Sequence, residues 1–489
     1  MNTEHDGKIC PLPDTFAFPH PESQQYPQLE SADYGTDLDA SLRFAEEVEN
    51  RLRYCLGIGW LSWDGKRWAK DGADHRAIEH SKHAARKWTE LAGKNHDEGR
   101  AARIKIALVL EGASHVKNAV ELARSAPRLA VSVADLDRDQ MLLNVSNGTI
   151  DLRTGTLRPH DRADLITKLA PVSFDPQARH PSLERYLQNL SVEIPDLADF
   201  LARCAGYALT GDASAESVFL IQGPGGNGKT TLLESLAAVL GDYSTKMEFS
   251  SLCASSRHAG RGAGSASPDI VKLRGSRLAY ASEGDQSARL DAGIVKLLSG
   301  GETITARELY ESPITFSQTF KLWLVSNYDP RCDADDSGLW RRLVKVPFAA
   351  LRGKPDPALK NTLVNNPAAR SALLAWAVHG CLDWQARGGG RGGLGIPEQV
   401  EAATAAYRSE QDTTGAWFAE LLADVAVLDT NGSTANRDLR IHYETWCGEN
   451  GASALSLPRF SRFLAERGLV KRQTKTGMVW KGVRIVSGS

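Results

Sequence analysis

The sequence predicts an α/β protein in three folded parts: a mostly helical N-terminal domain, a central α/β domain and a small C-terminal domain of the winged-helix type. Three observations lead to this prediction. Apolar residues recur at helical spacing from residue 37 onward. Short apolar runs alternate with helical patterns between residues 195 and 385, which is typical of an α/β domain. The last segment follows the order helix, helix and hairpin.

The N-terminal part divides into a tail and a domain. Residues 1–33 are rich in proline and polar residues, which predicts a disordered tail. Residues 34–190 are expected to form the mostly helical domain. It ends in a small β element, LLNVSNGTIDLRTGTLRPH, because short apolar runs flank the turn signals Asn147-Gly148 and Thr154-Gly155.

The remaining boundaries follow from composition and from helix end signals. The central domain is expected over residues 195–385. The run RGGGRGGLG favours a flexible linker and the pattern PEQVEAATAAYRSEQ after it favours a linking helix, and the two together are expected to occupy residues 386–411. The last domain is expected over residues 412–489, with one helix ending at Gly451, a second between Ser456 and Gly468, and a hairpin after it.

The composition narrows the class of protein. Lys and Arg number 58 against 60 Asp and Glu, so any surface that attracts nucleic acid must be local. The 7 cysteines are scattered without a C-x-x-C pair, which argues against a zinc site or a disulfide framework. We find no apolar signal core at the start and no run near about 18 apolar residues, so we expect a cytoplasmic protein without a membrane span.

One glycine-rich stretch carries the strongest chemical signal. Residues 221–236, IQGPGGNGKTTLLESL, fit the pattern G-x-x-x-x-G-K-[ST] between an apolar run and a helical pattern. Glycines let backbone N–H groups turn toward phosphate oxygens, and the helix N-terminus adds positive charge. We expect Lys229 to reach the β and γ phosphates of a nucleoside triphosphate and Thr230 to bind Mg²⁺. The predicted nucleotide-binding residues are Gly223, Pro224, Gly225, Gly226, Asn227, Gly228, Lys229, Thr230 and Thr231.

Polar residues also flank three further predicted strands. The run SRLAYASEGD ends in Glu283, with Asp285 two residues on, and a strand-end carboxylate there could hold the metal. The alternative is an ordinary solvated acid. The run FKLWLVSN ends in Asn327, which could orient water or the γ-phosphate. Arg341 and Arg342 precede another apolar run and could stabilise transition-state charge across a subunit boundary, or form a surface ion pair.

The order of these pieces resembles superfamily 3 helicases of the AAA+ class, in particular the helicase part of phage and plasmid primase–helicases, which are related to the poxvirus primase–helicase. The hallmark is a Lys, then a Gly-Gly-acid turn and an Arg, between the acid and the Asn. These are Lys296, Gly300-Gly301-Glu302 and Arg307. The resemblance covers about residues 37–489 and is most specific over residues 218–348.

The resemblance implies a role for each matching residue. Lys229 and Thr230 would be the Walker A residues, and Glu283 would be the Walker B carboxylate that shares Mg²⁺ with Thr230. Asn327 would be the sensor. Arg342 is the preferred arginine finger, because it is nearest the family's position before the final strand. Arg341 is the reserve.

The resemblance also implies an activity. The chain would be an ATP-dependent DNA helicase that serves replication of a phage, prophage or plasmid in a bacterial cytoplasm. Because the finger comes from a neighbour, the ring would be a homohexamer that translocates on single-stranded DNA through its channel. Two alternatives stay open: an ATP-switched origin-binding initiator, and an AAA+ remodeller or loader without unwinding activity.

The expected DNA contacts lie in two places. Residues 305–317 would form a channel hairpin, with Tyr310 near its tip available to stack on a base, although a packed structural Tyr fits equally well. Lys296 and Arg307 would touch DNA phosphate or the subunit interface. In the winged helix the DNA-binding candidates are Arg459, Arg462, Lys471 and Arg472, and the alternative is a basic face that packs on the ring.

A primase activity is not expected in this chain. The pair Asp135-Leu136-Asp137 has the D-x-D spacing of a primase metal site, but it precedes a helix or turn. We interpret it as a solvated acidic turn. Primer synthesis would then need a separate primase or polymerase.

Overall fold

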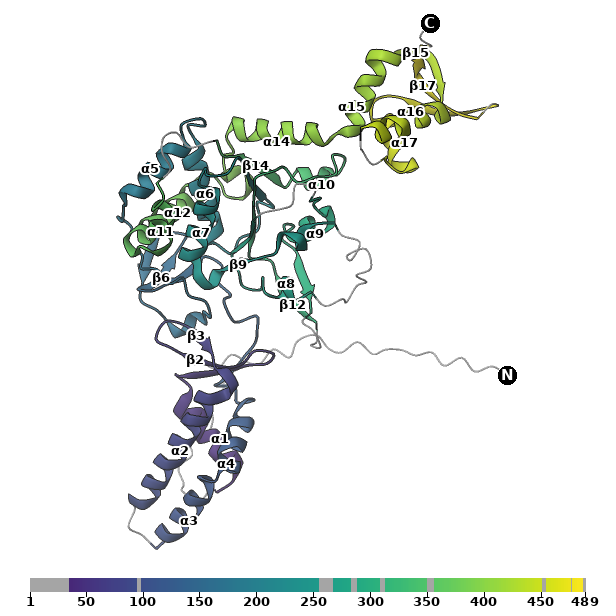
Figure 1. Cartoon of the computed structure of the whole chain (residues 1–489). Coiled ribbons are helices and arrows are strands. Elements are labelled where there is room, and N and C mark those ends of the chain that lie inside the picture. Colours follow the sequence, from purple (N-terminus) through teal and green to yellow (C-terminus); the bar gives the residue numbers. More distant parts are fainter. Residues whose placement is uncertain are drawn as a thin grey trace, which may run out of the picture.

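The computed structural model describes residues 35–94, 98–254, 267–282, 288–307, 313–349, 356–450, 454–475 and 477–486. Several predicted features lie outside these residues: the tail 1–33, Glu283, Asp285 and Tyr310. Figure 1 shows a central α/β body with a helical bundle beyond one end and a small α/β module beyond the other. Across the described residues, every helix is too short or too polar to cross a bilayer.

The first module combines four helices with a small sheet. Its core joins Phe44 and Val48 to Trp60, and Thr36 and Asp39 cap the first helix reciprocally. The sheet has the order β3-β2-β1-β4, which the sequence prediction missed because each strand has only 2 to 5 residues. The elements are α1 (Asp37–Val48), β1 (Leu52–Cys55), β2 (Gly59–Trp63), β3 (Trp68–Lys70), α2 (His75–Lys94), α3 (Arg100–Leu110), α4 (Ala113–Ala123) and β4 (Ala130–Val131).

A three-stranded antiparallel sheet follows where the sequence predicts a β element. Its strands are β5 (Leu142–Val145), β6 (Gly148–Asp151) and β7 (Thr156–Arg158), and α5 (Pro181–Leu190) comes after them. Both predicted turns lie between consecutive strands of this sheet. The expected boundary near residue 190 does not separate two cores, because Leu143 and Tyr186 share one buried cluster with residues of the central sheet such as Phe219.

The central body is a parallel five-stranded sheet of order β14-β8-β13-β10-β9. All six residues of β13 are buried, as expected for a strand covered on both faces. The strands are β8 (Val218–Gln222), β9 (Ser244–Lys246), β10 (Leu278–Ser282), β13 (Lys321–Ser326) and β14 (Leu343–Pro347). The helices are α6 (Leu197–Leu209), α7 (Lys229–Leu240), α8 (Pro268–Val271), α9 (Ala292–Leu297), α10 (Ser337–Trp340), α11 (Leu359–Asn365) and α12 (Pro367–Ala386).

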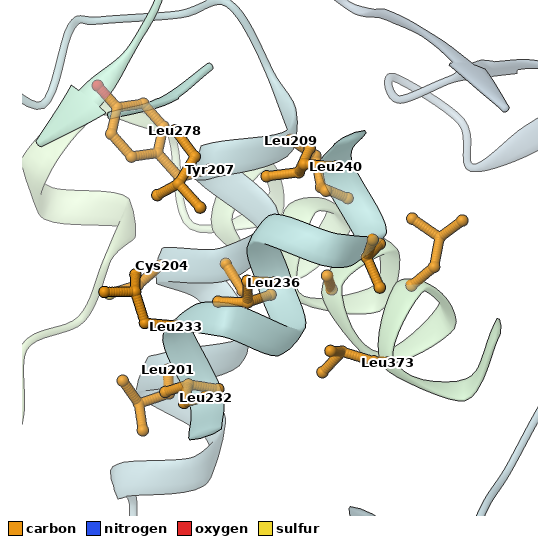
Figure 2. Packing of buried hydrophobic residues seen from close by; sticks show 14 of the residues in the cluster. Leu201, Cys204, Tyr207, Leu209, Leu232, Leu233, Leu236, Leu240, Leu278 and Leu373 are labelled. Carbon is orange, nitrogen blue, oxygen red and sulfur yellow. The ribbon is translucent and has the colours of Figure 1, made fainter. Parts of the chain in front are cut away.

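Side chains of α6, α7 and α12 meet in one layer against this sheet, as Figure 2 shows for Leu201, Leu236 and Leu373. The helices α6 and α12 approach closely. A Cβ at Gly380 would lie 1.9 Å from the carbonyl oxygen of Ala202, so only glycine fits there. This layer places the start of α7, and with it the glycine-rich loop, on a rigid support.

Within the segment 386–411, the glycine run is not a flexible linker, whereas the linking helix that the sequence predicts after it is present. Its glycines form α13 (Gly390–Gly393), whose Gly390 carbonyl accepts a hydrogen bond of 2.9 Å from Trp384 Nε1. The following helix α14 (Glu398–Gln411) buries Val400 and Tyr407 against the central body. The glycine-rich composition predicted a flexible run, but the glycines instead allow close contact with the indole ring of Trp384.

The last module contains the predicted helix, helix and hairpin, preceded by a helix and a strand that the prediction lacked. Its core gathers aromatic side chains, with the rings of Tyr443 and Phe460 stacked at 4.9 Å. The three strands have the order β15-β17-β16. The elements are α15 (Thr413–Glu420), β15 (Ala426–Ala435), α16 (Asn436–Glu449), α17 (Leu457–Glu466), β16 (Val470–Thr474) and β17 (Gly477–Ile485).

Candidate nucleotide site and its opposite edge

The carboxyl ends of the parallel strands meet at one edge of the sheet. Gln222 of β8 lies opposite Ser326 of β13 and Pro347 of β14, and Ser282 of β10 lies opposite Val325. The glycine-rich loop leaves from β8 and Asn327 follows β13, so both lie at this edge. Open α/β sheets bind their ligands there.

The glycines of the loop adopt backbone conformations that other residues rarely take. Gly226 and Gly228 have φ of 79° and 84°. A Cβ at Gly223 would lie 2.1 Å from the carbonyl oxygen of Phe348, whereas a Cβ at Gly225 or Gly226 would meet nothing within 4 Å. The loop is therefore tight at its base and open at its tip, where a phosphate group can approach the backbone.

Lys229 points into the loop from the first turn of α7. Its ammonium donates hydrogen bonds to the carbonyl oxygens of Gly223 at 2.7 Å and Pro224 at 2.8 Å, and to Asn227 Oδ1 at 2.9 Å. These three acceptors are uncharged, so none of them cancels the charge. Burial lowers the pKa of Lys229. Asn227 in turn donates to the carbonyl of Phe348 at 2.7 Å, which ties the loop to the end of β14.

Two cavities flank the loop. One of about 310 Å³ is lined mainly by apolar side chains and reaches Gly223 and Pro224. Its lining residues include Leu190, Val192, Ile194, Leu197, Pro347 and Phe348. The other, of about 430 Å³, lies between α7 and the ends of β9 and β10, and it contains Thr230, Glu234, Lys246 and Ser282. Thr230 is exposed there, and Thr231 is half-buried.

Tyr186 is a site residue that the sequence analysis missed. Its hydroxyl donates to the carbonyl of Gly228 at 2.9 Å, and its ring fills the space that a Cβ at Gly228 would need. Burial raises the pKa of this phenol. Tyr186 lies on α5, 42 residues before its partner Gly228 in the sequence, so no local sequence pattern identifies it as a site residue.

Asn327 is exposed one residue past the end of β13, and its carbonyl accepts a hydrogen bond of 3.2 Å from Gln222 Nε2. Since β13 lies between β8 and β10, Asn327 lies between the loop and the end of the strand that precedes Glu283. Glu283 and Asp285 fall outside the described residues, so their roles stay predictions.

The two arginines lie at the opposite edge, before β14. Arg342 forms an ion pair of 2.8 Å with Glu216, and its side chain is only 9 % exposed. The Arg341 side chain is 65 % exposed, and its guanidinium lies 3.6 Å from Glu216. Lys296 is at the same edge, paired with Asp336 at 2.8 Å. A Cβ at Gly338 would lie near both Lys296 and Arg342, so these two cations flank one turn.

The segment predicted to form the channel hairpin contains an antiparallel strand pair, which starts two residues earlier than expected. Strand β11 (Thr303–Ala306) pairs antiparallel with β12 (Ile314–Ser317). Arg307 directly follows β11, and its carbonyl accepts a hydrogen bond of 2.9 Å from Ser267 N. Tyr310 lies outside the described residues, so its stacking role stays a prediction.

The basic residues predicted to bind DNA in the C-terminal module differ in the contacts that their side chains make. Arg459 pairs with Asp333 of the central body at 2.6 Å, so it joins the two parts. Lys471 donates to Ser461 Oγ at 2.9 Å. Arg462 and Arg472 are exposed. Of the predicted DNA-contacting residues here, these two are therefore the ones best placed to meet a ligand.

The pair Asp135 and Asp137 is not an entirely solvated turn. Asp135 is exposed and caps its own turn through Ser132 N at 2.9 Å. Asp137 has φ of 52°, and its carboxylate accepts a hydrogen bond of 2.8 Å from Thr167 N. This hydrogen bond from Thr167 to Asp137 holds their two chain segments together.

Comparisons with known proteins agree with this arrangement of parts. Residues 41–192 match the family described as "D5 N terminal like", and residues 221–342 match "Family of unknown function (DUF5906)". Solved structures of the NrS-1 C-terminal region in the apo form match with a TM-score of 0.41 and 11 % identity, over 64 % of this chain and 77 % of that one.

Several curated relatives come from large DNA viruses. "Putative helicase L207/L206" of Acanthamoeba polyphaga mimivirus is 31 % identical over 46 % of this chain and 23 % of its own length. "Putative primase C962R" of African swine fever virus is 27 % identical over 65 % of this chain and 34 % of its own. "Putative helicase 022R" of Frog virus 3 is 24 % identical over 64 % and 39 %.

These matches therefore point to the primase–helicases as the class of protein that this chain resembles, as the motifs indicated. This chain is related to the family of the poxvirus D5 type through its D5-like N-terminal domain and its viral relatives. The matched stretches span about a quarter to two fifths of the length of these relatives.

Proposed function

We propose that this protein is an ATP-dependent DNA helicase that acts in replication and works as a homohexameric ring. The observation that carries the proposal is the loop around Lys229, which joins an open, glycine-lined tip to a buried ammonium with uncharged acceptors. A triphosphate offers that ammonium charged oxygens in place of carbonyls, which makes stronger hydrogen bonds.

The surroundings of the loop fit the other parts of ATP. The apolar cavity beside Gly223 suits a nucleobase, since such sites are concave and mostly apolar. On the other side, exposed Thr230 would hold Mg²⁺ together with Glu283. The bound metal would neutralise charge on the phosphates. Glu283 would polarise the attacking water, and Asn327 would orient it.

The opposite edge supports a ring. The loop and Asn327 lie at the carboxyl edge of the sheet, while Arg341 and Arg342 lie at the other edge. An arginine placed there can act only on the site of a neighbouring subunit. Since Arg342 is paired and buried in its own subunit and Arg341 is exposed, the geometry favours Arg341 as the finger, with Arg342 holding the turn through Glu216.

DNA would meet the ring at two places. The β11–β12 hairpin, with Arg307 at its shoulder and Tyr310 near its tip, would grip a single strand in the channel. The C-terminal module combines helices with a three-stranded sheet, which supports the proposal that it is a winged helix whose exposed Arg462 and Arg472 would contact phosphates. Lys296, paired with Asp336 beside the arginines, would serve the subunit interface.

The viral relatives support a role in DNA replication. We propose that the chain serves a phage, prophage or plasmid in the bacterial cytoplasm, with a separate primase or polymerase as partner. The test is ATP hydrolysis by the purified full chain with and without single-stranded DNA, beside Lys229→Ala. We expect DNA-stimulated hydrolysis that the variant loses by about a thousandfold or more, with hexamers retained.

Each alternative predicts a different result. Hydrolysis without any DNA stimulation or strand separation would favour a remodeller or loader. Negligible hydrolysis combined with ATP-driven assembly on duplex DNA would favour an initiator. Full activity in Lys229→Ala would refute the proposed site itself.

A further inference from the structure

A second cavity, remote from the nucleotide loop, lies within the N-terminal half of the chain. It has a volume of about 1280 Å³ and is formed by the end of α1, the start of β1, the segment around β4 and the residues that follow β7. This exceeds the roughly 300–1,000 Å³ of most small-molecule sites. Five arginines line it: Arg53, Arg128, Arg138, Arg153 and Arg162.

Three of the five arginines, Arg53, Arg138 and Arg162, form no ion pair with a carboxylate among the described residues. Arg162 donates to the carbonyl of Asn50 at 2.9 Å, and Arg53 donates to the carbonyl of Leu52 at 2.9 Å. Arg138 is exposed, and among the described residues its side chain has neither a hydrogen bond nor an ion pair. The other two are paired, Arg128 with Glu49 at 3.0 Å and Arg153 with Asp139 at 2.7 Å.

The acids of the lining do not cancel these charges. Asp164 pairs with Arg158, which lies outside the lining, at 2.7 Å, and Asp139 pairs with Arg153. Asp135 is the acidic lining residue without a salt bridge among the described residues. Burial lowers the pKa of Arg53, the nearby Glu49 carboxylate opposes this shift, and the nearby Arg162 adds to it. The wall is cationic and contains no aromatic residue.

We infer that this arginine-lined cavity binds the phosphate backbone of single-stranded DNA, as a second contact besides the channel. Guanidinium groups recognise phosphates through paired hydrogen bonds. A wall without aromatic rings offers no stacking platform, so the contact reads the backbone and not the bases. A flexible single strand can follow a concave wall, which the stiff double helix cannot do. The choice of DNA rests on the proposed helicase function.

The test uses the full-length protein and a fluorescein-labelled oligothymidine strand, with anisotropy measured over a series of salt concentrations. Arg138→Ala should weaken binding about three- to tenfold. It should also reduce the slope of log K against log salt by about 0.7, the value for one lost phosphate contact on a single strand. Arg138→Glu should weaken binding further.

The matched control is Arg86→Ala, which removes an exposed arginine on α2 outside the cavity. It should leave both affinity and slope at the wild-type values. Photo-crosslinking of a strand with a photoreactive base should label residues 127–131 or 162–165, which does not depend on a variant folding.

Three results would overturn the inference: equal affinities for the Arg138 and Arg86 variants, crosslinks confined to other segments, or no binding of the strand at all. A polyglutamate peptide that binds with the same dependence on Arg138 would assign the cavity to an acidic protein partner instead. If Arg138-dependent binding is found in a protein that neither hydrolyses ATP nor separates strands, the proposed function fails and this site stands.

Discussion

Tyr186 and Lys229 both hold the glycine-rich loop through hydrogen bonds to its carbonyl groups. Lys229 bonds to carbonyls inside the loop, and Tyr186 supports the carbonyl of Gly228 at its base. Tyr186 is almost fully buried, so a carbonyl deprived of its hydroxyl would have no water to replace it. The loop geometry thus depends on a residue of the preceding domain.

We predict that Tyr186→Phe raises KM for ATP about two- to tenfold, because the loss of one buried hydrogen bond costs about 0.5–1.5 kcal/mol. Steady-state hydrolysis at varied ATP measures it. The control is Tyr243→Phe, which removes a buried phenol hydroxyl that bonds to Asn144 N at 3.3 Å, away from the loop. It should lower the melting temperature without changing KM. Equal KM values in all three proteins would contradict a role for Tyr186 in the loop.

Lys321 and Arg277 are buried cations that join the sheet to earlier segments. Lys321 donates to the carbonyls of Asp212 at 3.1 Å and Thr319 at 3.2 Å, and Arg277 donates to the carbonyl of Leu142. Burial, reinforced by Arg277, lowers the pKa of Lys321 well below its usual range.

This shift makes stability depend on pH. Between the lowered pKa of Lys321 and its unfolded value of about 10.4, the unfolded chain binds more protons than the folded one, so the free energy of unfolding rises with pH. Lys321→Met lacks this contribution. Urea unfolding between about pH 7 and pH 10 should show the wild type gaining stability relative to the variant as pH rises. A constant difference would contradict the shift.

At this scale, sequence reasoning finds residues that belong to a local pattern. Lys229, Thr230 and Asn327 each stand at a fixed place beside a strand or loop, and the structure brings them to one edge. No local sequence pattern identifies Tyr186 or Glu216. The contact of Tyr186 with Gly228 joins segments 42 residues apart, and the contact of Glu216 with Arg342 joins segments 126 residues apart.

Among the elements, α13 is the one whose character the composition hides. Gly393 packs so closely that a Cβ would lie 2.6 Å from the Trp384 carbonyl oxygen, whereas a Cβ at Gly392 would meet nothing within 4 Å. Because Gly392 and Gly393 are neighbours in one short helix, the alanine variant of Gly392 is a matched control for the alanine variant of Gly393.

Gly393→Ala should therefore destabilise the central body by about 1–3 kcal/mol through overpacking. Gly392→Ala should be neutral or stabilising by up to about 1 kcal/mol, because alanine favours a helix more than glycine does. Urea unfolding followed by tryptophan fluorescence compares them. If both variants unfold like the wild type, this segment is a flexible linker after all.

Periodicity finds long elements and loses short ones. Buried strands such as β13 and amphipathic helices such as α17 were visible as apolar patterns in the sequence. The two-residue strand β4 and the three-residue β3 are too short to show a pattern, and β4 joins its sheet through a parallel pairing with β1 more than 70 residues away. Such pairings depend on the whole fold.

At the scale of the whole molecule, the expected division near residue 190 is replaced by one continuous core. Leu143 of β5, Tyr186 of α5 and Leu373 of α12 belong to the same buried cluster. Elements on both sides of the expected boundary, from β5 onward, therefore pack in the same core as α7, the helix that follows the glycine-rich loop. Sequence patterns could not reveal this, because each segment taken alone has its own apolar face.

The two edges of the sheet predict that active sites form between subunits. Arg341→Ala should bind ATP but lose hydrolysis by about a thousandfold, the scale of an arginine finger. The Lys229→Ala variant is also inactive, but a mixture of the two variants should regain part of the wild-type hydrolysis. In mixed rings, a Lys229→Ala subunit supplies its intact Arg341 to the intact loop of a neighbouring Arg341→Ala subunit. Parallel mixtures with Arg342→Ala decide which arginine acts. No recovery in either mixture would mean that neither arginine acts across subunits.

The central claim is that ATP hydrolysis at this loop drives strand separation. The most direct measurement is displacement of a labelled strand from a DNA duplex with a single-stranded tail, by the purified full chain, with 5′- and 3′-tailed substrates compared. We expect ATP-dependent displacement with one of the two tails and none by Lys229→Ala. Hexamers that hydrolyse ATP on DNA yet release no strand from either substrate would contradict it.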